Sequence, residues 1–354
     1  MSSYTETRID GVEFFPDKIM KLGLPLAVDD MSLANHLGIR GKTLWWLIHK
    51  RKSLYTLFTL PKRGRAGARG GRRSIQNPAD SMKAVQKNLL VRFLEPLPMA
   101  EHIGAYVLGR SCKDTAAQHV GKSIIISMDI KDFFPSVRQS VIKRFFNEDI
   151  GYNYPVASLL AALVTYGNFV PQGAPTSGAI ANVIANYTFD QKILNSLRQL
   201  DEGWTYTRYS DDIDISHPEK QSEERVQEII RMVALHLKTG GFRLNTEKTK
   251  TEPYYKQQRV LGMVVNEKVN VPRWEFMRVR SLIHNCLMHG FKTQYSRADA
   301  KSTISLKSHI RGKLAFFKNV DAVKAQRLKD KFDIACEIYK DSKEDEVQFN
   351  ADDS

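Results

Sequence analysis

Apolar residues recur at helical spacing along four stretches of the chain, and each stretch predicts one or two helices. The stretches are 32–47, 78–97, 179–187 and 226–237. The third is rich in small residues, which predicts close packing, and the fourth is followed by Gly240-Gly241, a typical stop signal. Similar spacing between 282 and 317 predicts further helices near the C-terminus.

Shorter runs carry the pattern of strands. Residues 55–60 predict one strand, 242–245 resume extended structure, and the apolar run 123–130 predicts a buried strand with Asp129 near its exit. In 204–216, aromatic and β-branched residues flank Ser210-Asp-Asp212, which predicts two short strands joined by a tight turn.

Composition points to a polyanionic partner. The chain has 354 residues, 42% of them apolar, a net charge of +14 and a pI near 9.5. Nucleic acid is the simplest partner for such a charge, and a generally basic surface is the alternative. Three widely spaced cysteines indicate neither a disulfide framework nor a zinc cluster. The chain start lacks a signal-peptide layout and no apolar run reaches membrane-spanning length, so we expect a cytoplasmic, reduced protein without a membrane partner.

The most basic segment lies between 62 and 73, where Lys62 and five arginines alternate with glycines. Glycine lets backbone N–H groups approach phosphate closely, and arginine can bind it through two parallel hydrogen bonds. This segment predicts phosphate binding, with a disordered basic loop as the alternative. The tail from Lys340 is acidic and polar and is expected to be poorly ordered.

Three carboxylates are candidates for a metal site. Asp129 ends one predicted strand, and Asp211 and Asp212 lie at the tip of the predicted hairpin. If these strands are neighbours in one sheet, the three carboxylates meet at one edge and repel one another unless a divalent cation lies between them. Two Mg²⁺ ions about 4 Å apart would suit in-line nucleotidyl transfer. Solvated turn residues and an ordinary strand end are the alternatives.

Ordered motifs around these carboxylates resemble the palm of reverse transcriptases. They are Asp129-Ile-Lys-Asp-Phe-Phe-Pro-Ser136, Gln172-Gly-Ala-Pro-Thr-Ser177 and Tyr209-Ser-Asp-Asp212. The resemblance continues upstream over 62–78 and downstream in 245–249, 260–266 and Pro272-Arg273, so that it covers roughly 30 to 320. The second motif and the compact length are most similar to bacterial retron-type enzymes.

The resemblance implies an α/β (α+β) right-hand polymerase with fingers, a palm of antiparallel sheet plus helices, and a helical thumb. The implied division is 1–30 as an N-terminal segment, 31–265 as fingers and palm, 266–335 as an RNA-binding thumb and 336–354 as an acidic tail. Ten Lys and Arg residues between 273 and 318 fit a thumb that faces RNA. A solvated helical surface is the alternative.

Roles can be carried over to matching positions. Asp129, Asp211 and Asp212 resemble the catalytic, metal-binding carboxylates, and the Ile130 carbonyl resembles a further metal contact. The resemblance implies a steric gate at Phe134, triphosphate binding by Arg73 and Lys62, a nucleotide pocket at Gln172, a primer grip at Leu261-Gly262 and a general acid at Lys248. A core phenylalanine and a solvated lysine are the alternatives for Phe134 and Lys248.

Three departures from the retron pattern weaken the assignment to retrons without removing a catalytic carboxylate. Thr115-Ala-Ala-Gln-His119 lacks the usual asparagine, Val260-Leu-Gly262 replaces the usual Val-Thr-Gly, and Ser210 replaces alanine. His119 itself is retained from the retron pattern, and a core histidine is the alternative interpretation of this residue.

The implied function is RNA-directed DNA polymerase activity with deoxynucleoside triphosphates (dNTPs) and two Mg²⁺ ions, for which Mn²⁺ could substitute. In a retron, a cognate structured non-coding RNA is template and primer, the product is a branched RNA–cDNA hybrid, and an effector protein completes antiphage defence. The rivals are a defence reverse transcriptase of the abortive-infection type that makes untemplated or protein-primed DNA, a non-catalytic RNA-binding scaffold, and an RNA-templated RNA polymerase.

Overall fold

The computed structural model describes residues 7–9, 12–61, 71–295 and 302–339. Lys62 with the basic residues up to 70, and the acidic tail from Lys340, lie outside the described residues. Backbone contacts divide the chain into two compact units. The first comprises Met1–Thr115 and Ser123–Thr251, and the second comprises Ala116–Lys122 and Glu252–Ser354.

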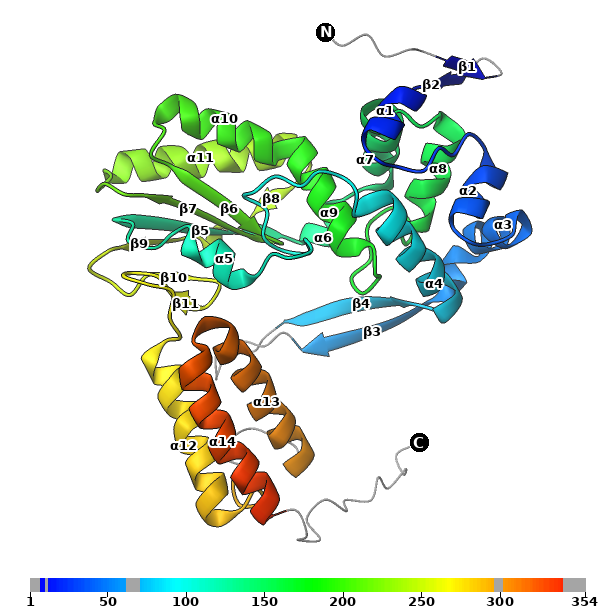
Figure 1. The fold of residues 1–354 in the computed structure, drawn as a ribbon. Coiled ribbons are helices and arrows are strands. Elements are labelled where there is room, and N and C mark those ends of the chain that lie inside the picture. The colour runs from blue at the N-terminus through cyan, green and yellow to red at the C-terminus, as the bar shows by residue number, and fades with distance from the viewer. Residues whose placement is uncertain (1–6, 10–11, 62–70, 296–301, 340–354) are drawn as a thin grey trace. The chain divides into compact units, whose positions relative to one another are not determined.

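The N-terminal part of the first unit is a small helical layer with two hairpins (Figure 1). Its elements are β1 (Thr7–Ile9), β2 (Val12–Phe14), α1 (Pro16–Lys21), α2 (Asp30–His36), α3 (Gly41–Lys50), a 3₁₀ turn (Arg51–Leu54), β3 (Tyr55–Pro61), β4 (Arg72–Pro78), α4 (Asp80–Leu89), α7 (Gln139–Arg144) and α8 (Tyr154–Leu163). Asp29 caps α2 by accepting a hydrogen bond from the Ser32 N–H at 2.7 Å. The predicted helices in 32–47 and the strand at 55–60 are confirmed as α2, α3 and β3.

The helix predicted over 78–97 is shorter than expected. Pro78 ends β4, α4 begins at Asp80, and a π-helical turn, Leu90–Leu94, ends the helix. The prediction was wrong at both ends because proline lacks the N–H that a helix interior needs, and Pro96 and Pro98 follow closely.

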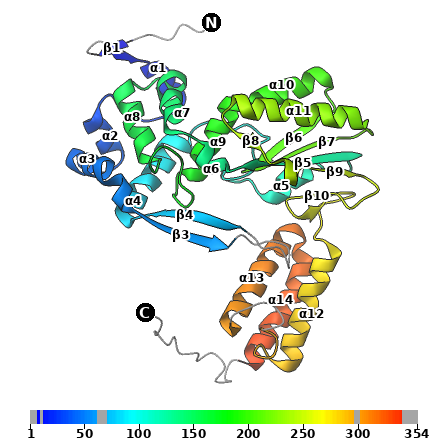
Figure 2. The same ribbon diagram turned by 180° about the vertical axis from the view of Figure 1, so that it is seen from behind.

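An antiparallel sheet forms the centre of the first unit. Its strand order is β6-β7-β5-β8, from β6 (Thr205–Tyr209), β7 (Asp212–His217), β5 (Ile124–Lys131) and β8 (Arg243–Leu244), and β9 (Lys250–Pro253) also pairs with β5. The helices of this part are α6 (Phe133–Ser136), α9 (Ser177–Ala185), α10 (Gln191–Leu200) and α11 (Glu223–Thr239), with a π-helical turn at Asn186–Asp190. A second π-helical turn, Phe145–Ile150, follows α7 in the helical layer. α10 and α11 lie side by side over the sheet (Figures 1 and 2). The strands predicted at 123–130 and 204–216 and the helices predicted at 179–187 and 226–237 are confirmed.

The second unit contains a small hairpin and three helices that pack on one another. The elements are β10 (Arg259–Val260), β11 (Met263–Val264), α12 (Arg273–His289), α13 (Thr303–Val320) and α14 (Ala322–Ile338), and α5 (Cys112–Ala117) leads into this unit. Ile283, Ile310 and Leu314 from the predicted apolar positions are buried. His119 is fully buried, and burial lowers its pKa to about 3, as befits a neutral core histidine. Among the described helices, none is long and apolar enough to cross a bilayer.

Candidate active site

The sheet brings the three carboxylates together. β5 and β7 are antiparallel neighbours, and Asp129 and Asp212 are directly paired in their register. Asp211 lies one residue before β7, and its carbonyl oxygen accepts a hydrogen bond from the Ile130 N–H at 2.8 Å. The condition set by the sequence, that the two strand units share a sheet, is therefore met.

The turn that carries Asp211 is tighter than the sequence indicated. Tyr209 and Asp212 form the last pair of β6 and β7, so Ser210 and Asp211 alone make the turn and Asp212 belongs to the strand. Ser210 has a φ of 62°, in the left-handed region that two-residue hairpin turns require. The turn therefore fixes the direction of Asp211 relative to the strand residue beside it.

Asp129 is the best-supported of the three carboxylates. One of its oxygens accepts from Asn245 Nδ2 at 2.8 Å and the other accepts from Lys248 Nζ at 2.6 Å. The Asn245 N–H also donates to the Asp129 carbonyl at 2.8 Å, and the 3₁₀ turn Thr246–Lys248 then brings the lysine back. The hydrogen bond to Asp129 raises the pKa of Lys248.

Asp212 shows the strain of crowded like charges. Loss of hydration, with repulsion from Asp211 and then Asp129, raises its pKa to about 6. The side chain keeps contact with solvent, which limits the unfavourable free energy. A cation bound between these carboxylates would remove the repulsion.

The donor set fits a divalent metal ion, since carboxylate oxygens are the ligands that hard divalent cations prefer. Among the described residues, no three His, Cys, Asp or Glu side chains already converge as a finished metal site. Lys248 holds one oxygen of Asp129, and burial with the two neighbouring carboxylates raises the pKa of Asp212. Asp129, Asp211 and Asp212 are the residues that would hold the ion.

A recess of about 460 Å³ is lined by Asp129 and Asp211, whereas Asp212 is not one of its lining residues. Seven of the predicted site residues line it: Arg73, Asp129, Ile130, Phe134, Gln172, Asp211 and Lys248. Lys62 lies outside the described residues, and Leu261 and Gly262 form the turn of the β10–β11 hairpin in the second unit. Their φ values of 50° and 80° are those of a tight two-residue hairpin turn.

Two neighbouring arginines on β4 differ in their freedom. Arg72 donates through Nε to the Thr59 hydroxyl at 2.7 Å, which ties its head to β3. The Arg73 side chain is exposed and makes no hydrogen bond or ion pair with any described residue, although its backbone pairs with β3. Arg73 is therefore the arginine of this pair whose guanidinium is available for a phosphate in the recess.

The loop that carries Gln172 is locked onto β4. The Gln172 N–H donates to the Gln76 side-chain oxygen at 2.7 Å, and the Gln76 N–H donates to the Gln172 carbonyl at 2.8 Å. Gly173 has a φ of 129°, and a Cβ there would lie 3.1 Å from the Gln76 carbonyl oxygen. Glycine is needed at this position, and the buried Gln76 is a positioning residue that the sequence did not reveal.

Phe134 is half-buried at the wall of the recess rather than sealed in the core. Its ring lies 5.5 Å from Phe133 and 6.2 Å, edge-on, from Tyr106. Tyr106 in turn covers Gly178, where a Cβ would lie 2.4 Å from the ring. Tyr106 was missed because it comes from an irregular segment without periodicity.

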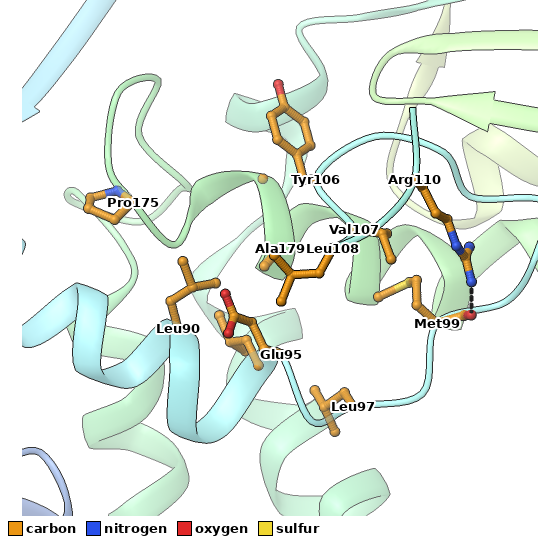
Figure 3. A pocket seen from close by; sticks show the side chains of 12 residues that line it. Leu90, Glu95, Leu97, Met99, Tyr106, Val107, Leu108, Arg110, Pro175 and Ala179 are labelled. Atoms are coloured by element: carbon orange, nitrogen blue, oxygen red, sulfur yellow. Dashed lines mark hydrogen bonds between the residues drawn. The ribbon is translucent and has the colours of Figure 1, made fainter. Parts of the chain in front are cut away.

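Figure 3 shows a second, mostly apolar hollow of about 530 Å³ in the same unit. Tyr106 and Pro175 are labelled on its wall, and Tyr106 lines both hollows. Arg110 donates to the Met99 carbonyl at 2.8 Å and to two further carbonyls, so its guanidinium is already bonded to the protein. Among the described residues that line it, Glu95 is the only carboxylate, so this hollow lacks the charge cluster of the recess.

A buried ionic network lies directly beneath the turn. Arg208 on β6 is fully buried and pairs with Asp190, Nη2 to Oδ2 at 2.8 Å and Nε to both oxygens at 3.0 Å. Its Nη1 donates to Asn182 Oδ1 at 2.9 Å and to the Ser210 carbonyl at 3.1 Å. The Tyr206 hydroxyl donates to Asp190 at 2.5 Å. Arg208 thus holds the turn from below, and the only sequence signal was an arginine within an otherwise apolar strand.

Comparison with known proteins agrees with this geometry. Residues 60–265 match the family model for reverse transcriptase (RNA-dependent DNA polymerase). The chain is 31% identical over 340 residues to the retron Mx65 reverse transcriptase of Myxococcus xanthus, covering 89% of this chain and 74% of the relative. It is 30% identical over 314 residues to the retron Ec86 reverse transcriptase of Escherichia coli, covering 88% of this chain and 90% of the relative.

Fold, carboxylates and family match together define an RNA-directed DNA polymerase of the right-hand type, with fingers, palm and thumb. Enzymes of this class depend in general on divalent metal ions. Within the class, the chain belongs to the bacterial retron-type reverse transcriptases. The resemblance noted in the sequence is confirmed, and its three departures do not remove the chain from that family.

Proposed function

We propose that the enzyme copies a cognate structured non-coding RNA, which serves as both template and primer, into retron cDNA. Asp129, Asp211 and Asp212 on paired strands are the observation that carries the chemistry. The named retron relatives support the choice of RNA. An internal 2′-hydroxyl of the RNA is the proposed primer, and an effector protein is the proposed partner in antiphage defence.

The recess supplies the groups that nucleotidyl transfer needs. Mg²⁺ bound by the three aspartates, or Mn²⁺ in its place, would lower the pKa of the priming hydroxyl and hold the triphosphate. The priming hydroxyl releases its proton to water as its oxygen forms a bond to the α-phosphorus, and the bond from that phosphorus to the leaving pyrophosphate breaks. Arg73 binds the triphosphate, and Lys248 donates a proton to the leaving pyrophosphate. Gln172 lines the nucleotide pocket, and Leu261-Gly262 contact the primer.

Phe134 is the proposed gate against ribonucleotides. We expect Phe134→Ala to admit ribonucleoside triphosphates, with a loss of sugar discrimination of about ten- to hundredfold, because the ring no longer clashes with a 2′-hydroxyl. The measurement is the ratio of kcat/KM for dNTP and ribonucleotide on one primer–template. Phe134→Tyr keeps the ring and serves as the control. Equal discrimination in Phe134→Ala and wild type would assign Phe134 to packing alone.

In the proposed division, residues 31–265 form the fingers and palm and residues 266–335 form the thumb. The thumb is the second surface that contacts the RNA. Within the second unit, cations of α13 such as Arg311 and Lys318 line a hollow with the apolar residues Leu314 and Phe332. Lys329 and Asp333 line the same hollow, and its excess of cations suits an RNA backbone.

The test of the proposed function is sequencing of the nucleic acid that copurifies with the protein when it is expressed with its neighbouring DNA. We expect cDNA of one sequence, complementary to an adjacent RNA and joined to it through a 2′-linkage, and none with Asp211→Asn. DNA of random sequence, or DNA joined to protein, would instead establish the untemplated or protein-primed rival. Loss of phage protection in the same variant tests the defence role.

A further inference from the structure

One tract of the chain carries positive charge without any acidic residue. Between Asp30 and Asp80 there is no acidic residue, while eleven Lys and Arg residues occur there against a net charge of +14 for the whole chain. Helix α3 lies within this tract and carries the adjacent pair Trp45-Trp46. A strongly positive tract attracts polyanions, whatever the role of the catalytic recess.

Helix α3 has two unlike faces. Leu44 and Leu47 are buried against the unit. The opposite face is exposed and carries Lys42, Trp45, Trp46, His49 and Lys50. Lys42, Trp46 and Lys50 follow one another at intervals of four residues, so they lie in one row along the helix. The Trp46 indole therefore has a lysine ammonium group one helical turn away on each side.

The two tryptophans are held differently. Trp45 is 44% exposed, donates its indole N–H to Asp30 at 2.6 Å and lies 5.6 Å from the His49 ring. Trp46 is 47% exposed and makes no hydrogen bond, ring contact or cation contact with any described residue. Trp46 therefore presents a free aromatic face, and Trp45 with its partners fixes the surface around it.

This surface fits single-stranded nucleic acid better than protein. Nucleobases of any kind stack on an exposed aromatic ring, and flanking cations track the phosphates. A typical protein surface carries charges of both signs, so most of the cations in this acid-free tract would find no anion opposite them. In both views α3 lies at the end of the unit away from the β5–β7 pair (Figures 1 and 2). A nucleotide of the RNA that is bound on α3 therefore lies away from the carboxylates and is not the one being copied.

We propose that the exposed face of α3 binds single-stranded RNA, with a base stacked on Trp46 and phosphates on Lys42 and Lys50. The inference rests on the proposed function only in taking RNA as the ligand. It adds a binding site outside the catalytic recess that holds an unpaired stretch of the RNA.

The test uses the full chain and a short unstructured oligoadenylate, with affinity measured across a range of salt concentrations. Trp46→Ala is expected to weaken binding roughly tenfold, because one stacked base is lost. Its salt dependence should not change, because no phosphate contact is removed. Trp46→Phe should keep the affinity but show less RNA-induced quenching of the protein's tryptophan fluorescence than wild type, because the contribution of Trp46 is lost and that of Trp45 remains. Leu235→Ala, an exposed apolar residue on α11, is the matched control.

The cations are tested separately. Lys42→Gln combined with Lys50→Gln should lower the slope of log affinity against log salt by about 1.4, since each phosphate contact on a single strand contributes about 0.7. Arg231→Gln combined with Lys238→Gln on α11 also removes two positive charges, on a helix outside the tract, and should leave the slope unchanged.

Two results would overturn the inference. They are Trp46→Ala binding within twofold of wild type, and quenching in Trp46→Phe as large as in wild type; either would show that no base stacks on Trp46 and would favour a protein partner for the α3 face. Failure of the proposed function is distinguishable. If no templated cDNA forms but Trp46→Ala still loses affinity for oligoadenylate, the retron role is wrong and the α3 site stands.

Discussion

Two charge clusters lie on neighbouring strands of one sheet, and they are built on opposite principles. Beneath the turn, Arg208 and Asp190 are fully buried and every charge has its partner. Above it, Asp129, Asp211 and Asp212 crowd like charges together, with Lys248 as the ammonium bonded to the group. The inner cluster is complete within the protein, whereas the outer one gains by binding a cation from solution.

The difference separates structure from function in the same strands. A buried ion pair with all hydrogen bonds made fixes geometry, because losing one partner leaves an uncompensated charge. A crowded set of carboxylates disfavours its own ionised state and so favours metal ions. The Ser210 carbonyl joins the two, since Arg208 donates to it and Asp211 follows it. The complete cluster thereby positions the incomplete one.

The largest effect is expected from removing a charge of the outer cluster. Asp211→Asn should lower the rate of primer extension by roughly a thousandfold or more, because metal binding contributes several kcal/mol to transition-state stabilisation. Thermal stability should be unchanged or higher, because Asp212 loses a repelling neighbour. Asp132→Asn makes the same change at another carboxylate of the recess and should keep activity. Equal rates in wild type and Asp211→Asn would refute the catalytic assignment.

The inner cluster should respond in stability first. Asp190→Leu leaves the Arg208 guanidinium buried without its counter-charge, which destabilises by about 3–5 kcal/mol. Urea unfolding measures this change. The double variant with Arg208→Met should be less destabilised than Asp190→Leu alone, because it buries no lone charge. Strictly additive losses in this double-mutant cycle would show that the two residues stabilise the fold independently.

Substitutions of Lys248 test whether this lysine, which is bonded to Asp129 in the outer cluster, donates a proton or only supplies a counter-charge. Lys248→Gln should reduce kcat by about a hundredfold if the lysine protonates pyrophosphate. Lys248→Arg keeps a positive charge beside Asp129 but cannot readily release a proton. Loss of activity in both variants supports the general acid, and full activity in Lys248→Arg supports the ion pair alone.

The outer cluster was predictable from sequence and the inner one was not. The apolar run before Asp129 and the alternation around Asp211 are local patterns, so strands and carboxylates could be placed together once the strands were assumed to pair. Arg208 could be noticed as a charge in an apolar strand, but its partner Asp190 comes from a π-helical turn whose position in space no spacing rule predicts. Tyr106 and Gln76 reach the site through irregular segments and loop contacts, which leave no period in the sequence.

The smallest effect is expected at the residue that joins the clusters. Ser210 adopts a φ of 62°, which is unfavourable for a residue with a Cβ, whereas glycine reaches it freely but loses more entropy on folding. These terms oppose each other, so Ser210→Gly should change the free energy of unfolding by less than about 1 kcal/mol. Extension rates should fall no more than a few-fold, because the carbonyl that accepts from Arg208 belongs to the backbone and remains in the variant. Ser210→Ala removes the same hydroxyl while keeping a Cβ. If both variants lost activity as severely as Asp211→Asn, the serine hydroxyl itself would act in the outer cluster, and the division between a positioning cluster and a metal-binding one would have to be redrawn through Ser210.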